Sequence, residues 1–288
     1  MTAAPLPDTF QFSQSSLQDY VDCHRRFQLR YVLMQPWPAL IADKPSDLEQ
    51  RMERGAGLHH LAHQYALGLD ATSLAATIHD ETLARWWQTF LSHPPAGLPK
   101  GIHRPEVVVS APLAGCRLVA KFDLLAAEPG ERLVVVDWKT VQRRPARNVL
   151  ARRMQTRIYR ALAVEAGAAF FEGRSPRPEQ VEMVYWFAEQ AGATERFAYD
   201  TGQHTAAMES LAELISEITQ TGGEIWPLTP DVGQCRLCNY RSLCERGVKA
   251  GFLEELDDDV EPSEGVGEVE EIRLGQIVDL EQIAEVEF

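Results

Sequence analysis

The sequence has no long hydrophobic run. Nowhere in its 288 residues does an apolar stretch approach the roughly 18 residues of a membrane-spanning helix. The opening stretch, MTAAPLPDTF, also lacks the basic segment followed by an apolar segment that marks a secretory signal. We therefore expect a cytoplasmic protein that does not bind membranes.

Cysteines are few, and five of them in a cytosolic chain do not predict a disulfide framework, because that compartment keeps thiols reduced. Three stand close together in CRLCNYRSLC, as Cys235, Cys238 and Cys244. This spacing indicates a metal site that needs a fourth ligand, which Cys23 or Cys116 could supply. Thiolate ligands suit zinc or an iron–sulfur cluster, and the spacing alone does not separate the two.

Positive charge is scarce overall, with 28 Lys and Arg against 42 Asp and Glu, a net charge of −14. Residues 254–288 hold fourteen Asp and Glu against Arg273, a net of −13, so residues 1–253 carry a net of only −1. Within residues 139–160, eight Lys and Arg occur without a single acid. Such a segment favours phosphate binding, although a solvated basic helix face is the alternative.

The composition predicts one folded domain followed by a tail. An apolar fraction of 45% and a charged fraction of 24% are ordinary for a soluble globular protein, and we assign the domain to residues 1–253. We predict a flexible acidic tail over residues 254–288, because its stretch DDDVEPSEGVGEVEE contains too few large apolar side chains to pack. The tail would either compete with nucleic acid for the basic segment or serve as a solubilising or docking tail.

Hydrophobic periodicity predicts an α/β fold with helices packed on a mixed sheet. Turn signals at residues 114–115 and 128–131 separate three strand patterns, which indicates an antiparallel meander. The expected helices cover residues 13–31, 48–66, 71–91, 148–169 and 204–221, and the expected strands cover residues 106–113, 116–125, 132–138, 181–188 and 195–199.

The strand pattern LVVVDWKT ends in two charges that a buried strand should avoid. Asp137 and Lys139 share one face of the strand, and Trp138 points to the other. A hairpin centred near Gly130 places Asp123 opposite Asp137 or one residue out of register, and directly paired side chains lie roughly 5 Å apart. Two such carboxylates favour a hard cation such as Mg²⁺ or Mn²⁺ between them. The alternative is an ion-pair cluster at a sheet edge.

These residues also resemble a known family. KFDLL followed by VVVDWKT is similar to the two acidic motifs of the PD-(D/E)xK nuclease superfamily, with Asp123 and Asp137 as the acids and Lys139 as the lysine. RGAGLHHLAH resembles the Gly-x-x-apolar-His motif of the RecB-like branch, in which His59 would ligate the metal. The alternatives for His59 are a satisfied core histidine or, with His63, half of a zinc site, but the Glu of the His-Glu-x-x-His pattern is missing.

A further stretch, MQTRIYRAL, resembles the Gln-x-x-x-Tyr motif of the same branch. Gln155 and Tyr159 are one helical turn apart, so both face one side, and core packing is the alternative reading. The resemblance implies that both residues act in catalysis. It also implies that His59, Asp123, Asp137 and the Trp138 carbonyl hold one or two Mg²⁺ or Mn²⁺ ions, while Lys139 orients the attacking water.

The RecB-like branch includes nucleases with an iron–sulfur staple, in which one cysteine precedes the nuclease core and three follow it. Cys23 with Cys235, Cys238 and Cys244 has this layout, which implies a 4Fe-4S cluster. His24 stands where many members have proline. The resemblance thus implies a restriction-endonuclease-like core, a mixed central sheet flanked by helices, with a helical N-terminal region and a C-terminal cysteine-rich staple.

The function that follows is a metal-dependent deoxyribonuclease, an exonuclease acting on DNA ends or single strands. The basic stretch from Arg143 to Arg160 would grip the DNA backbone. No helicase phosphate loop is present, so unwinding would come from a helicase or from a CRISPR or DNA-repair partner. The alternative is a catalytically silent DNA-binding or helicase-partner subunit with a zinc or iron–sulfur staple.

Overall fold

The computed structural model describes residues 6–7, 9–35, 47–236 and 238–249, with side chains in the third range from residue 50 onward. The predicted acidic tail lies outside these residues. In this part of the chain a six-stranded mixed sheet runs in the order β1-β3-β4-β5-β6, and β2 pairs with β3. Its strands are β1 (Gln11–Phe12), β2 (Ile102–Leu113), β3 (Cys116–Glu128), β4 (Arg132–Lys139), β5 (Val181–Phe187) and β6 (Ala193–Ala198).

The predicted meander is present as β2, β3 and β4, which pair antiparallel in chain order. Ala114 and Gly115 form the first turn and both have positive φ. Gly130, with φ 79°, forms the second turn, where glycine adopts the left-handed backbone without a side-chain clash. β4 then pairs parallel with β5, so the chain leaves the sheet between them through helices that cover one face.

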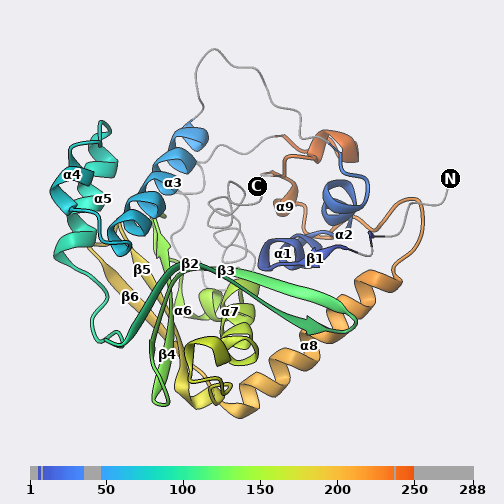
Figure 1. Ribbon diagram of the computed structural model, residues 1–288. Coiled ribbons are helices and arrows are strands. Elements are labelled where there is room, and N and C mark those ends of the chain that lie inside the picture. The colour runs from blue at the N-terminus through green and yellow to red at the C-terminus, as the bar shows by residue number, and fades with distance from the viewer. Residues whose placement is uncertain (1–5, 8, 36–46, 237, 250–288) are drawn as a thin grey trace.

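Helices lie on both faces of the sheet (Figure 1). The short 3₁₀ segments are Gly167–Phe170, Pro178–Gln180 and Arg241–Cys244, and a π-helical turn spans Gln28–Val32. The helices are α1 (Gln14–Asp22), α2 (His24–Phe27), α3 (Asp47–Ala66), α4 (Ala71–Ala75), α5 (Glu81–Ser92), α6 (Arg147–Arg152), α7 (Met154–Glu165), α8 (Thr201–Gln220) and α9 (Gly233–Arg236). None of the described helices is long and apolar enough to cross a membrane.

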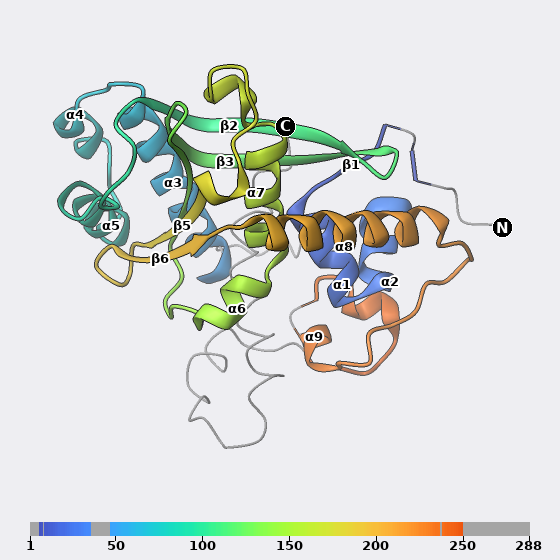
Figure 2. The same ribbon diagram turned by 90° about the horizontal axis from the view of Figure 1, so that it is seen from below.

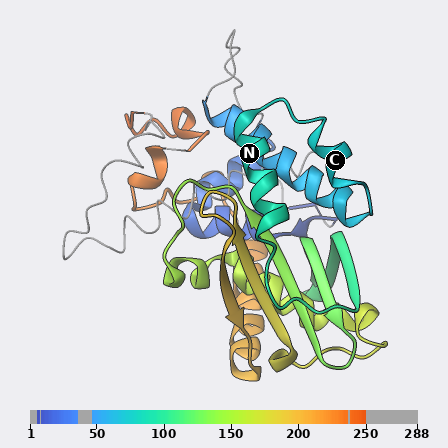
Figure 3. The same cartoon turned by 90° about the vertical axis from the view of Figure 1, so that its left-hand side faces the viewer.

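Each face of the sheet packs in its own hydrophobic cluster. On one face, Phe122 and Val135 contact α7 and α8 through residues such as Ile158 and Leu211. On the other face, Val136 and neighbouring strand residues pack against α3 and α5. Figure 3 shows the layer of α3, α4 and α5 stacked on this second face, and Figure 2 shows α8 crossing the molecule on the first. Both faces are therefore covered, which explains why the strand patterns are almost continuously apolar.

Three helices that the periodicity predicts as continuous are broken. Cys23, with φ −165° and ψ 110°, separates α1 from α2, and Arg153, with φ −60° and ψ 143°, separates α6 from α7. The helix expected over residues 71–91 stops after α4, and Asp80 begins α5 as an N-cap that accepts the N–H of Leu83. Apolar spacing continues across all three breaks, because each pair of helices packs on the same surface, so the pattern cannot reveal a single extended residue.

The two ends of the folded body meet. The aromatic rings of Phe27 and Trp226 stack with centroids 5.7 Å apart, and the N–H of Arg25 donates to the carbonyl of Pro227 at 3.1 Å. Figures 1 and 2 both place α9 beside α1 and α2. The cysteine-rich C-terminal segment therefore lies beside the N-terminal helices.

Candidate active site

The β3–β4 hairpin brings the two predicted carboxylates to one place. The antiparallel ladder ends at the pair Leu124 and Val136, and the same register places Asp123 opposite Asp137. Beyond this point Oδ2 of Asp123 accepts the backbone N–H of Trp138 at 2.7 Å. A side-chain hydrogen bond thus continues the contact between the two strands, and it fixes the Asp123 carboxylate against β4.

His59 reaches this hairpin from α3, on the second face. Its Nδ1 lies 3.2 Å from Oδ1 of Asp123, and its Nε2 lies 3.1 Å from the carbonyl oxygen of Trp138. His60, the next residue along α3, is exposed and lines a separate pocket between α3 and α5. Of the two neighbouring histidines on α3, His59 is the one that contacts the carboxylate.

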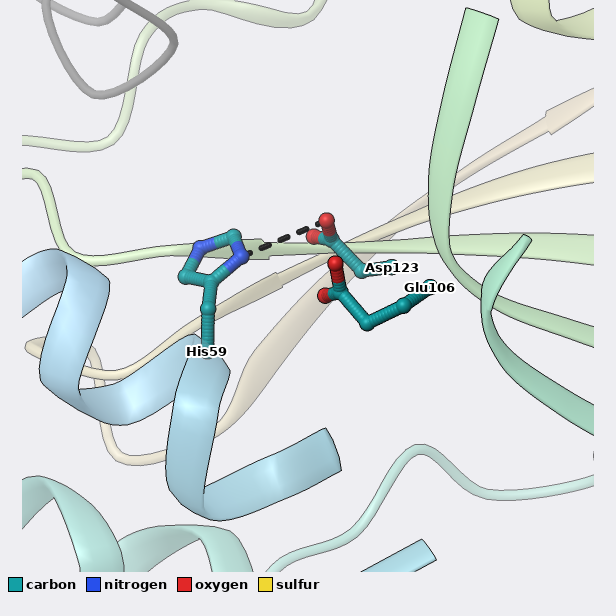
Figure 4. Close-up of side chains that lie close together, drawn as sticks. All are labelled: His59, Glu106 and Asp123. Carbon is teal, nitrogen blue, oxygen red and sulfur yellow. Dashed lines mark ion pairs between the residues drawn. The ribbon is translucent and has the colours of Figure 1, made fainter. Parts of the chain in front are cut away.

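Glu106, on β2, is a further member of the cluster that the sequence reasoning missed. One ligand atom each of His59, Glu106 and Asp123 lies within 4.8 Å of the other two, and Figure 4 shows both carboxylates turned toward the imidazole. The sequence could have predicted this position, because a hairpin with its turn at residues 114–115 pairs position 106 with position 123. The observed neighbouring pairs, Pro105 with Leu124 and Val107 with Phe122, have this register.

The backbone of Glu106 is strained, and its side chain is paired. Its φ is 52°, a left-handed value that costs a residue with a Cβ about 1 kcal/mol or more. Its carboxylate forms an ion pair with Lys121, which projects from the same face of β3 as Asp123. Such outliers cluster at functional sites, where the surrounding structure holds them in place.

Asp137 and Lys139 form a buried ion pair, with Nζ 2.9 Å from Oδ2 and side chains 4% and 2% exposed, respectively. The other carboxylate oxygen, Oδ1, accepts a hydrogen bond from Nε2 of Gln155 at 2.6 Å. Burial raises the pKa of Asp137 to about 7, and the negative charge of Asp123 adds to this rise while Lys139 opposes it. Burial also acts to raise the pKa of Asp123, but His59 and the Trp138 N–H outweigh it and hold that pKa below its usual value.

The two residues of the predicted Gln-x-x-x-Tyr pair have different contacts. The extended backbone at Arg153 starts α7 just before Gln155, and this places Gln155 in the first turn, beside Asp137. Tyr159 lies one turn later, where its hydroxyl accepts from Gln14 of α1 at 3.4 Å and its ring packs on Phe122.

Residues 11–245 match the family model of the PD-(D/E)XK nuclease superfamily. This span contains His59, Asp123, Asp137 and Lys139 together with both ends of the cysteine pattern. The chain belongs to the PD-(D/E)XK nuclease superfamily. The restriction-endonuclease-like α/β fold, with its mixed sheet between helices, is confirmed.

The chain was also compared with solved structures. The crystal structure of a "Putative exonuclease" from Eubacterium rectale is similar with a TM-score of 0.50 at 11% identity, covering 88% of this chain and 95% of the other. The crystal structure of SSO0001 aligns with a TM-score of 0.37 at 11% identity, over 82% of this chain and 85% of the other. None of the curated proteins compared with the chain matches it.

The basic stretch of this PD-(D/E)XK chain does not form one exposed face, which corrects the expectation that residues from Arg143 to Arg160 all grip DNA. Arg160 is buried, and its guanidinium donates to the carbonyl of Ala198. Arg144 and Arg147 form ion pairs with Glu195. The reason is that α7 packs between the sheet and α8, so its arginines hydrogen-bond to residues of these neighbouring elements.

The four cysteines that the resemblance selects converge between the N-terminal and C-terminal segments of the PD-(D/E)XK domain. Burial raises the pKa of Cys238 to about 11, and the neighbouring thiols of Cys23 and Cys244 contribute to the rise. Burial likewise raises the pKa of Cys244, and the neighbouring thiols of Cys23 and Cys235 raise it further. Cys116 begins β3, in the turn between β2 and β3.

Proposed function

We propose that the protein is a metal-dependent deoxyribonuclease that hydrolyses phosphodiester bonds at DNA ends or in single strands, as an exonuclease. The observation that carries the proposal is the cluster of His59, Glu106 and Asp123 ligand atoms within 4.8 Å, placed beside the buried pair of Asp137 and Lys139. Superfamily membership supports phosphodiester hydrolysis. DNA as the substrate and exonuclease action are the finer parts of the proposal.

The residues fit a divalent ion of the Mg²⁺ or Mn²⁺ type. Carboxylate and carbonyl oxygens are the ligands that these hard ions prefer, and His59 would add one nitrogen ligand. Oδ2 of Asp137 is buried and lies 2.9 Å from Nζ of Lys139, its ion-pair partner. His59, Glu106, Asp123, Asp137 and the Trp138 carbonyl would hold the metal.

When bound, the metal would lower the pKa of a water molecule and stabilise the negative charge that develops on the phosphate. Lys139 compensates the charge of Asp137 in a site that excludes bulk water, and its ammonium would orient the attacking water and hydrogen-bond to a phosphate oxygen. Gln155 holds Oδ1 of Asp137, which fixes the orientation of that carboxylate.

Backbone contacts would come from arginines that remain exposed beside the site. The loop that follows Lys139 carries Arg143, and α6 carries Arg152, and both are exposed. Because phosphate contacts are independent of sequence, this arrangement favours cleavage without base recognition.

The cysteines would hold a 4Fe-4S cluster. The thiols of Cys23 and Cys244 lie close enough to Cys238 to raise its pKa, which supports one shared site for these cysteines. The cluster would join Cys23 to the C-terminal cysteines.

The test is a cleavage assay on purified full-length protein with end-labelled linear single-stranded DNA, linear double-stranded DNA, closed circular single strands and RNA, each with Mn²⁺ or EDTA. We expect Mn²⁺-dependent release of short products from linear DNA and none from circles. Lys139→Ala is the inactive control, which should still fold and bind DNA. DNA binding without cleavage in any metal would instead identify a silent DNA-binding or helicase-partner subunit.

A further inference from the structure

We propose that Tyr185 is a positioning residue that fixes the orientation of Asp137 by acting through Gln155. The inference rests on the proposed function, because it assigns to Tyr185 a part in preparing Asp137 for a divalent metal. Tyr185 lies on β5, outside the sequence motifs that predicted the site.

A continuous set of hydrogen bonds connects the two residues. In the parallel β4–β5 ladder Tyr185 is the register partner of Asp137. The Tyr185 hydroxyl donates to Oε1 of Gln155 at 3.3 Å, and Nε2 of Gln155 donates to Oδ1 of Asp137 at 2.6 Å. The side-chain amide therefore bridges the tyrosine and the carboxylate.

Thr156 extends this chain on the other side of the tyrosine. Its hydroxyl donates to the Leu150 carbonyl at 2.5 Å, and its oxygen lies 2.7 Å from the Tyr185 hydroxyl. Each hydroxyl has one proton to donate. Thr156 therefore acts as an acceptor toward Tyr185, and the Tyr185 proton is shared between Thr156 and Gln155.

The hydrogen-bonded side chains are shielded from water. Tyr185 and Thr156 are 0% exposed and Gln155 is 2% exposed, so no solvent molecule replaces a lost partner. An amide whose oxygen is held by Tyr185 must present its NH₂ group to Asp137, because the reversed amide would place its oxygen against Oδ1 of Asp137, acceptor against acceptor.

The consequence is a choice between the two oxygens of Asp137. The amide occupies Oδ1, and Oδ2 is left facing Lys139. The Tyr185 ring also lies under this pair, with the Lys139 Nζ 5.6 Å from the ring centroid. Tyr185 thereby determines which oxygen is presented to a metal, without touching the metal or the substrate.

The test uses Tyr185→Phe, which removes the hydroxyl and keeps the ring. Tyr199→Phe is the matched control, because the Tyr199 hydroxyl is buried and makes no hydrogen bond with the described residues. We expect Tyr185→Phe to weaken Mn²⁺ binding by about three- to tenfold, the effect of one lost buried hydrogen bond, as measured by calorimetry on metal-free full-length protein. Tyr199→Phe should bind Mn²⁺ as the wild type does.

A double-mutant cycle separates positioning from a general loss of packing. If Tyr185 acts through Gln155, Tyr185→Phe should cause no further weakening of Mn²⁺ binding in a Gln155→Leu background. An equal loss in both backgrounds would overturn the proposal, and so would wild-type affinity in Tyr185→Phe. Thr156→Val, compared with Thr156→Ser, provides a second pair in case Tyr185→Phe is unstable. Thr156→Val removes the competing acceptor and directs the Tyr185 proton to Gln155, so it should bind Mn²⁺ at least as tightly as Thr156→Ser; weaker binding would overturn the proposal.

Failure of the inference and failure of the proposed function give different results. A wild-type protein that binds no Mn²⁺ would overturn both. A wild-type protein that binds Mn²⁺ and cleaves DNA, with a Tyr185→Phe variant of equal affinity, would overturn the role of Tyr185 alone.

Discussion

Oδ2 of Asp123 accepts the backbone N–H of Trp138 at 2.7 Å, at the point where β3 and β4 stop pairing. One carboxylate thus both closes the hairpin and contributes an oxygen to the candidate metal site. The two roles can be separated experimentally, since an amide oxygen can accept the same N–H but carries no charge.

Asp123→Asn should therefore fold like the wild type and lose cleavage. We expect at least an approximately hundredfold drop in the rate of DNA cleavage with Mn²⁺, because the metal loses a charged ligand. Thermal denaturation in EDTA should give a midpoint within a few degrees of the wild type. Asp123→Ala, which also removes the acceptor for Trp138, should be less stable; wild-type cleavage by Asp123→Asn would exclude a role for Asp123 in catalysis.

Glu106 should be required for metal binding but not for folding. Glycine adopts the φ of 52° without strain, so Glu106→Gly should keep the stability of the metal-free protein, while its Mn²⁺ affinity falls about tenfold or more. Glu106→Gln keeps the strained backbone and the side-chain size, and it should lose affinity without gaining stability. Unchanged Mn²⁺ affinity in both variants would remove Glu106 from the site.

The raised pKa of Asp137 should make the stability of the metal-free protein depend on pH. Burial raises its pKa to about 7, against about 3.9 in an unfolded chain. Between these values the folded state holds a proton that the unfolded state has released, so the free energy of unfolding falls as pH rises from about 4 to 7. Thermal midpoints in EDTA should fall less steeply over this range for Asp137→Asn. Parallel pH profiles for the two proteins would contradict the raised pKa.

The cysteine site predicts a brown protein after anaerobic purification, with iron and no zinc in elemental analysis. Cys23→Ser should lose both the colour and thermal stability, because in the proposed cluster Cys23 would join the N-terminal helices to the C-terminal segment. Cys116→Ser is the control and should keep its iron, since Cys116 lies in the β2–β3 turn. Stoichiometric zinc without iron would replace the cluster with a zinc staple.

Deleting residues 254–288 tests the acidic tail. A docking or solubilising tail predicts the same DNA affinity for the truncated and full-length proteins at low salt, and this is the result we expect. A tail that competes for the DNA-binding surface predicts tighter binding after truncation, with the difference shrinking as salt screens both interactions. Filter binding or anisotropy at several salt concentrations measures this difference.

Local patterns predicted the sheet and much of the site. The charged end of VVVDWKT and the turn at Gly130 together located Asp123, Asp137 and Lys139, because strand periodicity and hairpin register are short-range properties. Gln155 followed from the resemblance to the Gln-x-x-x-Tyr motif, whereas the break at Arg153 that begins its helix was not predicted.

The rest depends on contacts between segments far apart in the chain. Tyr185 reaches Gln155 only because β5 returns beside β4, and no spacing within one element encodes that pairing. The burial of Arg160 likewise depends on contact with the Ala198 carbonyl. A count of basic residues therefore overestimated the exposed positive charge.

The stack of Phe27 on Trp226 has a consequence for synthesis of the protein. The ribosome releases Phe27 about 200 residues before Trp226, and contacts so distant in the chain form late and slowly. Until the C-terminal segment emerges, the aromatic face of the N-terminal helices has no cover and is a surface for aggregation or chaperone binding. Chains terminated before Trp226 should therefore be held by chaperones even when their β-sheet is complete.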